Sequence, residues 1–272
     1  MELDDYLSLG RATSNIGLGC GRLVGRASLR RSAEIVETAL ELGIRHFDVA
    51  PSYGMGTAEE VLGAVLQSVP DVTVTTKVGI ARPPYARGRA LVRRVAKPLL
   101  DRRRSLKSLA QGVGRATPAG GQRHSFAFSS EAIRTSLEES LEKLRRESVD
   151  VLLLHEPMPS DLNPDTQQCL ELLAREGLFS RFGVGIDARS DRWQQFGSVW
   201  QSRWPGDGFG AYRADVSYVF HGAVRYAMAR PVDEPDTPPS AAVRAAVERA
   251  PHSVLLISAA TPARLRELLQ AR

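Results

Sequence analysis

Four residues whose side chains can exchange protons stand at related positions in this chain: Asp48, Tyr53, Lys77 and His155. The carboxylate, the ammonium and the imidazole each lie at or just after the carboxyl end of a short apolar segment, and the phenol follows the carboxylate by five residues. In a β/α barrel the carboxyl ends of the strands converge on one mouth, so residues far apart in sequence meet there. The pattern therefore predicts a proton-transfer site.

Each of these residues alone has an ordinary structural explanation, such as a turn, a solvated amine or a satisfied polar group. Their combination indicates function, because burying three ionisable groups beside one phenol is costly unless they pair. Clusters of this kind are usually functional.

The ordinary proton affinities of these groups suggest which role each has in proton transfer. A tyrosine has an ordinary pKa of about 10, and a nearby ammonium favours the phenolate and lowers that pKa. We expect Lys77 to supply the ammonium and Asp48 to hold it in place and protonated. Tyr53 is then the general acid for a carbonyl oxygen, and His155 hydrogen-bonds the same oxygen.

The reaction class follows from what the sequence lacks. There is no G-x-S-x-G motif, and Cys20 has no obvious base. Reduction is therefore favoured over acyl transfer. The hydride must come from a cofactor, because no side chain can donate one.

The composition is that of an ordinary globular protein, with 43% apolar and 25% charged residues among 272. This length fits one α/β barrel or two ordinary domains. We find no apolar run near eighteen residues and no signal-peptide pattern, so we expect no membrane span. Cys20 and Cys169 form no CxxC motif, which excludes a disulfide framework, offers no metal-site spacing and suits a reducing cytoplasm.

The net charge of +5 hides an uneven distribution. Residues 81–128 hold twelve Lys or Arg and one acid, Asp101, so they carry +11 and the rest of the chain −6. The simplest interpretation is a solvated insertion at about 80–128. Attraction for a phosphorylated or carboxylated substrate is an alternative. Nucleic-acid binding is disfavoured, because Tyr85 and Phe126 are too few and too far apart to form a stacking platform.

Short apolar segments alternate with amphipathic ones, which is typical of parallel strands covered by helices. The pattern predicts seven strands, at 16–19, 44–48, 72–77, 149–154, 182–185, 215–220 and 253–257. It predicts helices near 29–42, from 57 onward, and near 130–146, 165–175 and 240–249. We place no eighth strand, and we expect residues 221–239, rich in Pro and Asp, to be a degenerate or missing seventh unit.

Two helix ends carry local signals. Gly43 follows the first predicted helix, where a left-handed cap belongs. Thr57 and Glu60 form a capping-box pattern at the start of the second.

The distribution of reactive residues over several strand ends favours a closed barrel over an open sheet, whose chemistry gathers at one switch point. The glycine-rich stretch 17–21 lacks the third glycine of a dinucleotide fingerprint, so we reject a Rossmann fold. The expected fold class is α/β, a (β/α)8 TIM barrel formed by a single domain over residues 1–272.

Five segments resemble the aldo-keto reductase family around its catalytic Asp, Tyr, Lys and His. They are FDVAPSYG (47–54), AEEVLG (58–63), TTKVG (75–79), SLEESL (136–141) and DVLLLH (150–155). The likeness is close over residues 16–79 and 129–186. It implies a (β/α)8 barrel that uses NADPH, or less often NADH, to reduce an aldehyde or ketone or to oxidise the corresponding alcohol or sugar.

The segment SAATPARLRE (258–267) resembles the part of that family that holds the cofactor's adenosine phosphate. Thr261 can cap the helix and Pro262 opens its first turn, leaving backbone N–H groups for a phosphate. Arg264 would pair with the 2′-phosphate of NADP. An ordinary capped C-terminal helix is the alternative. The cofactor-binding residues that the resemblance implies are Gly19, Cys20, Asp48, Ser258, Thr261, Arg264 and Glu267.

The sequence also departs from the family pattern. A basic residue often found where Ser258 stands is missing, which weakens the case for NADP over NAD. Gly185 and Ile186 replace the Ser-Asn pair that holds the carboxamide after the fifth strand. The seventh strand and its pyrophosphate-covering loop are not recognisable. We therefore expect an intact catalytic half and a trimmed cofactor-binding half, and cofactor binding that is weak or completed by a partner subunit stays open.

Together these features predict a cytoplasmic NAD(P)H-dependent oxidoreductase for a small carbonyl or sugar-like compound. The alternative is a reductase-like barrel that senses a nucleotide or serves as a non-catalytic binding subunit. The basic insertion follows the strand of Lys77, so we expect it to lie over the mouth and to favour an anionic substrate. No metal and no membrane partner are expected, and the oligomeric state stays open.

Overall fold

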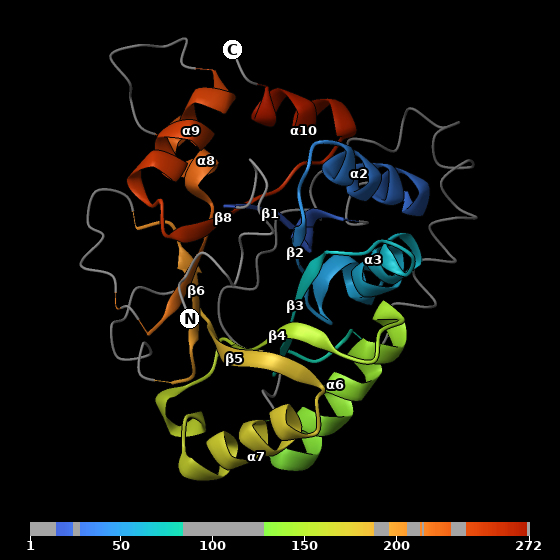
Figure 1. Ribbon diagram of the computed structural model, residues 1–272, viewed down its shortest axis with the longest axis vertical. Helices are drawn as coiled ribbons and strands as arrows, with labels where there is room; N and C mark the ends of the chain where they lie inside the picture. The colour runs from blue at the N-terminus through green and yellow to red at the C-terminus, as the bar shows by residue number, and fades with distance from the viewer. Residues whose placement is uncertain are drawn as a thin grey trace, which may run out of the picture.

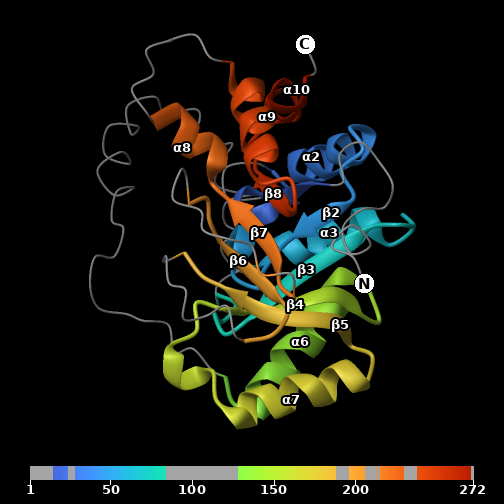
Figure 2. The same cartoon turned by 60° about the vertical axis from the view of Figure 1, so that its left-hand side comes forward.

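The computed structural model of the chain describes residues 15–23, 28–83, 128–187, 196–205, 213, 215–229 and 238–270. Eight parallel strands form a closed barrel in chain order, and helices lie around its outside (Figures 1 and 2). The strands are β1 (Ile16–Gly19), β2 (His46–Asp48), β3 (Thr73–Val78), β4 (Val149–His155), β5 (Phe179–Gly185), β6 (Val199–Arg203), β7 (Ser217–His221) and β8 (Ser253–Ile257). The (β/α)8 barrel expected from the sequence is therefore confirmed.

The helices follow the strands around the barrel. They are α2 (Leu29–Glu41), α3 (Ala58–Leu66), α6 (Ser130–Leu144), α7 (Pro164–Arg175), α8 (Ala223–Ala229), α9 (Pro239–Arg249) and α10 (Pro262–Leu269). Three short 3-10 turns, η1 (Cys20–Arg22), η2 (Tyr53–Gly56) and η4 (Pro159–Asp161), lie after β1, β2 and β4. None of the helices in the described residues is long and apolar enough to cross a membrane.

The core has an inner and an outer layer, and β4 shows why. Its Val151 and Leu153 belong to the small cluster inside the barrel, whereas Leu152 and Leu154 pack with the helices outside. Successive residues of a strand point to opposite faces, so a strand covered on both sides must be apolar throughout. This accounts for the continuous apolar runs in the sequence.

All seven predicted strands are present, and the eighth is β6, which the sequence analysis did not place. Its residues Gln201 and Ser202 are polar but buried, so the segment lacks the apolar run that marks the other strands. We expected residues 221–239 to be a degenerate or missing seventh unit. The unit is not missing, because β7 is followed directly by α8, while residues 230–237 lie outside the described part of the chain.

The two helix-end signals had different outcomes. Gly43 adopts the left-handed conformation, with φ of 84°, as predicted. The capping box of Thr57 and Glu60 is wrong, because Thr57 makes no side-chain cap and has helical dihedral angles instead of extended ones. Its hydroxyl donates a 2.8 Å hydrogen bond to the carbonyl of Gly54 in the preceding turn.

Most of the basic insertion, residues 84–127, lies outside the described residues, so its expected role stays a prediction. Both ends of it are described. The Arg82 guanidinium binds the buried carboxylate of Glu59 at 2.6 Å and the carbonyl of Gly56 at 2.9 Å. Phe128 is buried against Gly79. The insertion therefore leaves and rejoins the barrel at two anchored points.

Helices α3 and α6 pack against one another at Gly63. A Cβ atom at this position would lie 2.4 Å from the carbonyl oxygen of Lys143 and 2.6 Å from the carbonyl carbon of Leu144. Both are backbone atoms, so a side chain fits only if one helix moves.

We expect Gly63→Ala to lower the free energy of unfolding by about 1–3 kcal/mol, because the added methyl overpacks the contact between the helices. In an exposed helix the same change would stabilise by about 1 kcal/mol. Chemical denaturation measures the difference. Ala64→Gly, at the exposed neighbouring position, is the control and should show only the propensity loss. A stabilised Gly63→Ala variant would contradict the close contact.

Candidate active site

A large cavity of about 1260 Å³ lies at the carboxyl ends of the strands. Asp48, Tyr53 and His155 line it together with residues that follow β5, β6, β7 and β8. Residues that are distant in sequence therefore share one space because their strands end at the same mouth.

The first part of the site is a buried ion pair between β2 and β3. The Nζ atom of Lys77 donates to both carboxylate oxygens of Asp48 at 2.6 Å and to the carbonyl of Val49 at 3.3 Å. The side chains are 1% and 4% exposed. Asp48 pairs with Thr75 in the sheet, and Lys77, two residues further along, points to the same face.

Tyr53 lies close both to this pair and to His155. The Lys77 ammonium is 5.1 Å from the centroid of the Tyr53 ring. The rings of Tyr53 and His155 are 5.9 Å apart and nearly perpendicular. The structure therefore brings all four predicted residues together, each at the strand end or turn where the sequence placed it.

The pKa of Tyr53 corrects one expectation. Burial raises it above its ordinary value of 10, and the charge of Lys77 reduces this shift without reversing it. For Lys77, burial favours a lower pKa, but the charge of Asp48 and hydrogen bonding outweigh burial and leave the pKa raised. The ammonium therefore stays charged, while the phenol keeps its proton near neutrality.

His155 is neutral in this environment. Burial lowers its pKa to about 3, and the charge of Lys77 contributes to the shift. Its Nδ1 atom is buried and has no hydrogen-bond partner among the described residues. A neutral imidazole can hydrogen-bond a substrate oxygen without adding a charge to the site.

Gln201 is part of this network and was missed by the sequence analysis. From β6 its Nε2 atom donates to Oδ2 of Asp48 at 2.7 Å, and the residue is 4% exposed. Gly185 leaves room for it, since a Cβ atom there would lie 3.2 Å from Oε1 of Gln201 and 3.6 Å from Cε of Lys77. No motif in the sequence marks this glutamine; the only signal is a buried polar residue on a strand.

The candidate cofactor-binding residues separate into two groups. Besides Asp48, the cavity is lined by Gly19, Ser258 and Arg264. Cys20, Thr261 and Glu267 are not among the lining residues. Cys20 is fully buried with a raised pKa caused first by burial, so its thiol is unsuited to contact a ligand directly.

The start of α10 closes one end of the cavity. The Thr261 hydroxyl accepts a hydrogen bond from the N–H of Arg264 at 3.2 Å, as predicted for a cap. The Arg264 guanidinium pairs with Glu267 at 2.6 Å, and Ser258 donates to the carbonyl of Gly19 at 2.8 Å. The cavity reaches from Tyr53 to Arg264 and is larger than the roughly 300–1,000 Å³ of ordinary small-molecule pockets.

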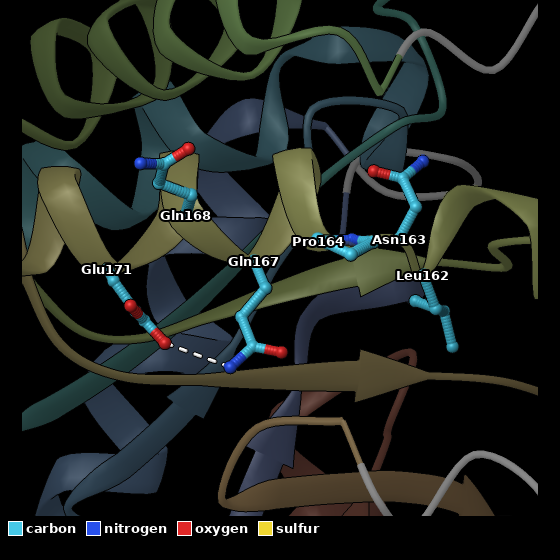
Figure 3. Close-up of a pocket in the computed structure, with 6 residues that line it drawn as sticks. All are labelled: Leu162, Asn163, Pro164, Gln167, Gln168 and Glu171. Carbon is cyan, nitrogen blue, oxygen red and sulfur yellow. Dashed lines mark hydrogen bonds between the residues drawn. The ribbon is translucent and has the colours of Figure 1, made fainter.

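A second, smaller hollow of about 350 Å³ lies on α7 and the turn before it (Figure 3). Leu162, Asn163 and Gln167 are among its lining residues, and none of the four clustered polar residues reaches it. Gln167 is already hydrogen-bonded to Glu171 at 2.9 Å. The carboxylate that lines this hollow, Glu171, accepts that hydrogen bond, whereas Asp48, Tyr53 and His155 line the large cavity. Within the described parts of the chain, no group of three or more His, Cys, Asp or Glu is placed to hold a metal ion.

Comparison with known proteins now identifies the family. A model described as the aldo/keto reductase family matches residues 15–198, which are more than half of the chain. The chain belongs to the aldo/keto reductase family.

Curated relatives of this aldo/keto reductase are named as dehydrogenases, reductases or oxidoreductases. D-threo-aldose 1-dehydrogenase from a Pseudomonas species is 31% identical over 183 residues, which cover 65% of this chain and 49% of that protein. L-galactose dehydrogenase from Arabidopsis thaliana is 26% identical over 190 residues, which cover 68% and 48%. The chain thus spans about half the length of the curated relatives it matches.

Solved structures of aldo/keto reductases have the same fold. One from Bacillus halodurans in its holo form has a TM-score of 0.70 at 18% identity, covering 97% of this chain and 88% of that one. One from Klebsiella pneumoniae in complex with NADP and acetate has a TM-score of 0.62 at 15% identity, covering 94% and 84%. At these identities the likeness establishes the fold alone.

We expect Lys77→Met to lower the free energy of unfolding by about 3–5 kcal/mol, because it leaves Asp48 buried and uncompensated. The double variant Asp48→Leu/Lys77→Met should recover most of this loss, since no unpaired charge remains. Denaturant unfolding measures both. Arg30→Met, which breaks an exposed pair with Glu34, is the control and should change little. A Lys77→Met variant as stable as the parent would show that water reaches the carboxylate.

Proposed function

We propose that this aldo/keto reductase is an NAD(P)H-dependent oxidoreductase that reduces an aldehyde or ketone, or oxidises the corresponding alcohol or sugar. The observation that carries the proposal is that the Tyr53 ring lies close to both Lys77 and His155 and lines the same cavity as His155. The names of the curated relatives, which include aldose and L-galactose dehydrogenases, agree with this reaction class.

In this proposal the protein residues handle the oxygen and its proton. Tyr53 donates its proton to the carbonyl oxygen as that oxygen gains negative charge. Neutral His155 hydrogen-bonds the same oxygen and orients the carbonyl. Lys77, held by Asp48, places a fixed positive charge behind the phenol. A nicotinamide cofactor supplies the hydride, which no side chain can donate.

We assign NADP as the cofactor, with NAD as the alternative. Arg264 lines the cavity near the start of α10, where a phosphate would meet both a guanidinium and the positive end of the helix dipole. One structural neighbour of the same fold was solved in complex with NADP. The pairing of Arg264 with Glu267 means that a 2′-phosphate competes with a carboxylate for this guanidinium.

The same geometry favours catalysis over the alternative of a nucleotide-sensing or non-catalytic subunit. A barrel that only binds has no need to bury an ion pair beside a phenol and a neutral imidazole, because that arrangement adds desolvation cost without contributing a binding surface. The preference for anionic substrates rests on the basic insertion and stays a prediction.

The pKa shifts predict the pH dependence. Tyr53 is protonated below its raised pKa, so kcat/KM for reduction should be flat from about pH 6 to about pH 9 and fall only above about pH 10. Oxidation needs the deprotonated form, so its rate should rise with pH over that range. His155, with a pKa of about 3, should add no step near neutrality. Steady-state kinetics in both directions measure these profiles. A value of kcat/KM for reduction that falls as the pH rises through 6.5 would contradict them.

We expect Tyr53→Phe to lower kcat for reduction by about 10²–10⁴-fold, because the general acid is lost. The affinity for NADPH and NADH, measured by nicotinamide fluorescence, should stay within about twofold of the parent because the ring is retained. Tyr218→Phe is the matched control, since it removes a buried hydroxyl that accepts from the N–H of Arg213 away from the cavity. Parental turnover in Tyr53→Phe would refute the role of the phenol.

A further inference from the structure

Glu156, the residue directly after His155, has an unusual backbone. Its φ is 53°, in the left-handed region that is unfavourable for a residue with a side chain. Its N–H donates to the carbonyl of Gly185 at 2.8 Å, so the turn is tied to the end of β5. The residue lines the same cavity as Tyr53. The strained conformation therefore fixes this acidic residue on the wall of that cavity.

One oxygen of this carboxylate is held in place. Oε1 accepts a 2.6 Å hydrogen bond from the N–H of Asp187. Asp187 is itself fixed by Arg203, whose Nε and Nη2 atoms bind its two oxygens at 2.9 and 2.6 Å. His221 lies 3.8 Å from Asp187 on the other side. The clamp thus spans the ends of four neighbouring strands, β4 to β7.

The other oxygen, Oε2 of Glu156, has no hydrogen-bond partner among the residues that the structure describes. Burial raises the pKa of Glu156, although the hydrogen bond from Asp187 opposes that shift. This oxygen is not enclosed by protein atoms, so water or a ligand that enters the cavity can supply its donor.

The charge of the cavity decides which donor suits this oxygen. Four arginines line the cavity, namely Arg22, Arg203, Arg225 and Arg264, against three acids, Asp48, Glu156 and Asp187. A cationic substrate would be repelled by the arginines, and an anionic group beside the reacting carbon would be repelled by Glu156. An uncharged hydroxyl group, which donates to Oε2 without adding a charge, meets neither penalty.

We propose that Glu156 is a specificity-determining residue that accepts a hydrogen bond from a substrate hydroxyl near the carbonyl, so that the substrates are hydroxyaldehydes or sugars and not simple aliphatic aldehydes. The clamp of Asp187 and Arg203 positions this carboxylate. The assignment rests on the proposed function and deepens it by naming the substrate class.

The test compares two three-carbon aldehydes that differ only in their hydroxyl groups, glyceraldehyde and propanal. Glu156→Gln keeps the shape of the side chain but removes its charge. We expect this variant to lose about tenfold or more in kcat/KM for glyceraldehyde, as expected for a hydrogen bond to a charged group, and less than about threefold for propanal. Glu147→Gln is the matched control, because Glu147 is an exposed carboxylate just before the opposite end of β4.

Each outcome of this comparison decides the proposal. Equal losses for both aldehydes in Glu156→Gln would mean that Glu156 only supports the fold of the site, and would overturn it. Unchanged selectivity would also overturn it. A parent enzyme that prefers aminoacetaldehyde, and loses that preference in Glu156→Gln, would assign the carboxylate to a cation instead.

A binding arm separates this inference from the proposed reaction. If the parent turns over neither aldehyde, the proposed function fails, and ligand-detected NMR of erythritol and 1-butanol still tests Glu156. Binding of erythritol that weakens in Glu156→Gln, with 1-butanol unchanged, would support recognition of hydroxyl groups. Equal signals from parent and variant would refute it.

Discussion

The buried pair of Asp48 and Lys77 is the interaction on which the site depends. Removing both charges from water costs several kcal/mol per ion, and that cost is offset only if the remaining donors and acceptors are satisfied. Here Lys77 binds both carboxylate oxygens and Gln201 adds a further donor. The three residues come from β2, β3 and β6, so the pair holds strands from different parts of the barrel at a fixed separation. The phenol of Tyr53 lies beside this pair, and the imidazole of His155 lies beside the phenol.

Backbone strain accompanies two of the residues that line the cavity, Tyr53 and His155. Tyr53 begins a turn in which Met55 has a φ of 60°, and His155 is followed by Glu156 with a φ of 53°. Left-handed conformations are costly for residues with a side chain, and they persist where surrounding contacts impose them, often at functional sites. The hydrogen bonds from Thr57 to Gly54 and from Glu156 to Gly185 supply such contacts. These contacts with the barrel thus hold the strained turns at its mouth in place.

The features that depend on apolar runs and strand ends were predicted from the sequence. The features that depend on tertiary contacts were not. Seven strands and the four clustered polar residues follow from hydrophobic patterning and from the rule that strand ends converge. Strand β6 was missed because Gln201 interrupts its apolar pattern. That side chain is polar and buried because it donates a hydrogen bond to Asp48 on β2. Glu156 carries no motif, since its role depends on a φ angle and on the N–H of Asp187. The direction of the Tyr53 pKa shift depends on burial, which spacing alone does not reveal.

The upward shift of the Tyr53 pKa comes first from burial, and the same ion pair explains why Lys77 does not reverse it. Lys77 does not act on the phenol as a bare cation, because Asp48 lies 2.6 Å from its ammonium and cancels most of its field. Burial of the hydroxyl therefore outweighs the attraction, and the proton stays on the oxygen near neutrality. In the proposed reaction this proton leaves only when a stronger base hydrogen-bonds to the phenol, and the developing alkoxide of a reduced carbonyl is such a base. The arrangement thus couples proton release to the arrival of negative charge on the substrate, and it keeps the site from ionising beforehand.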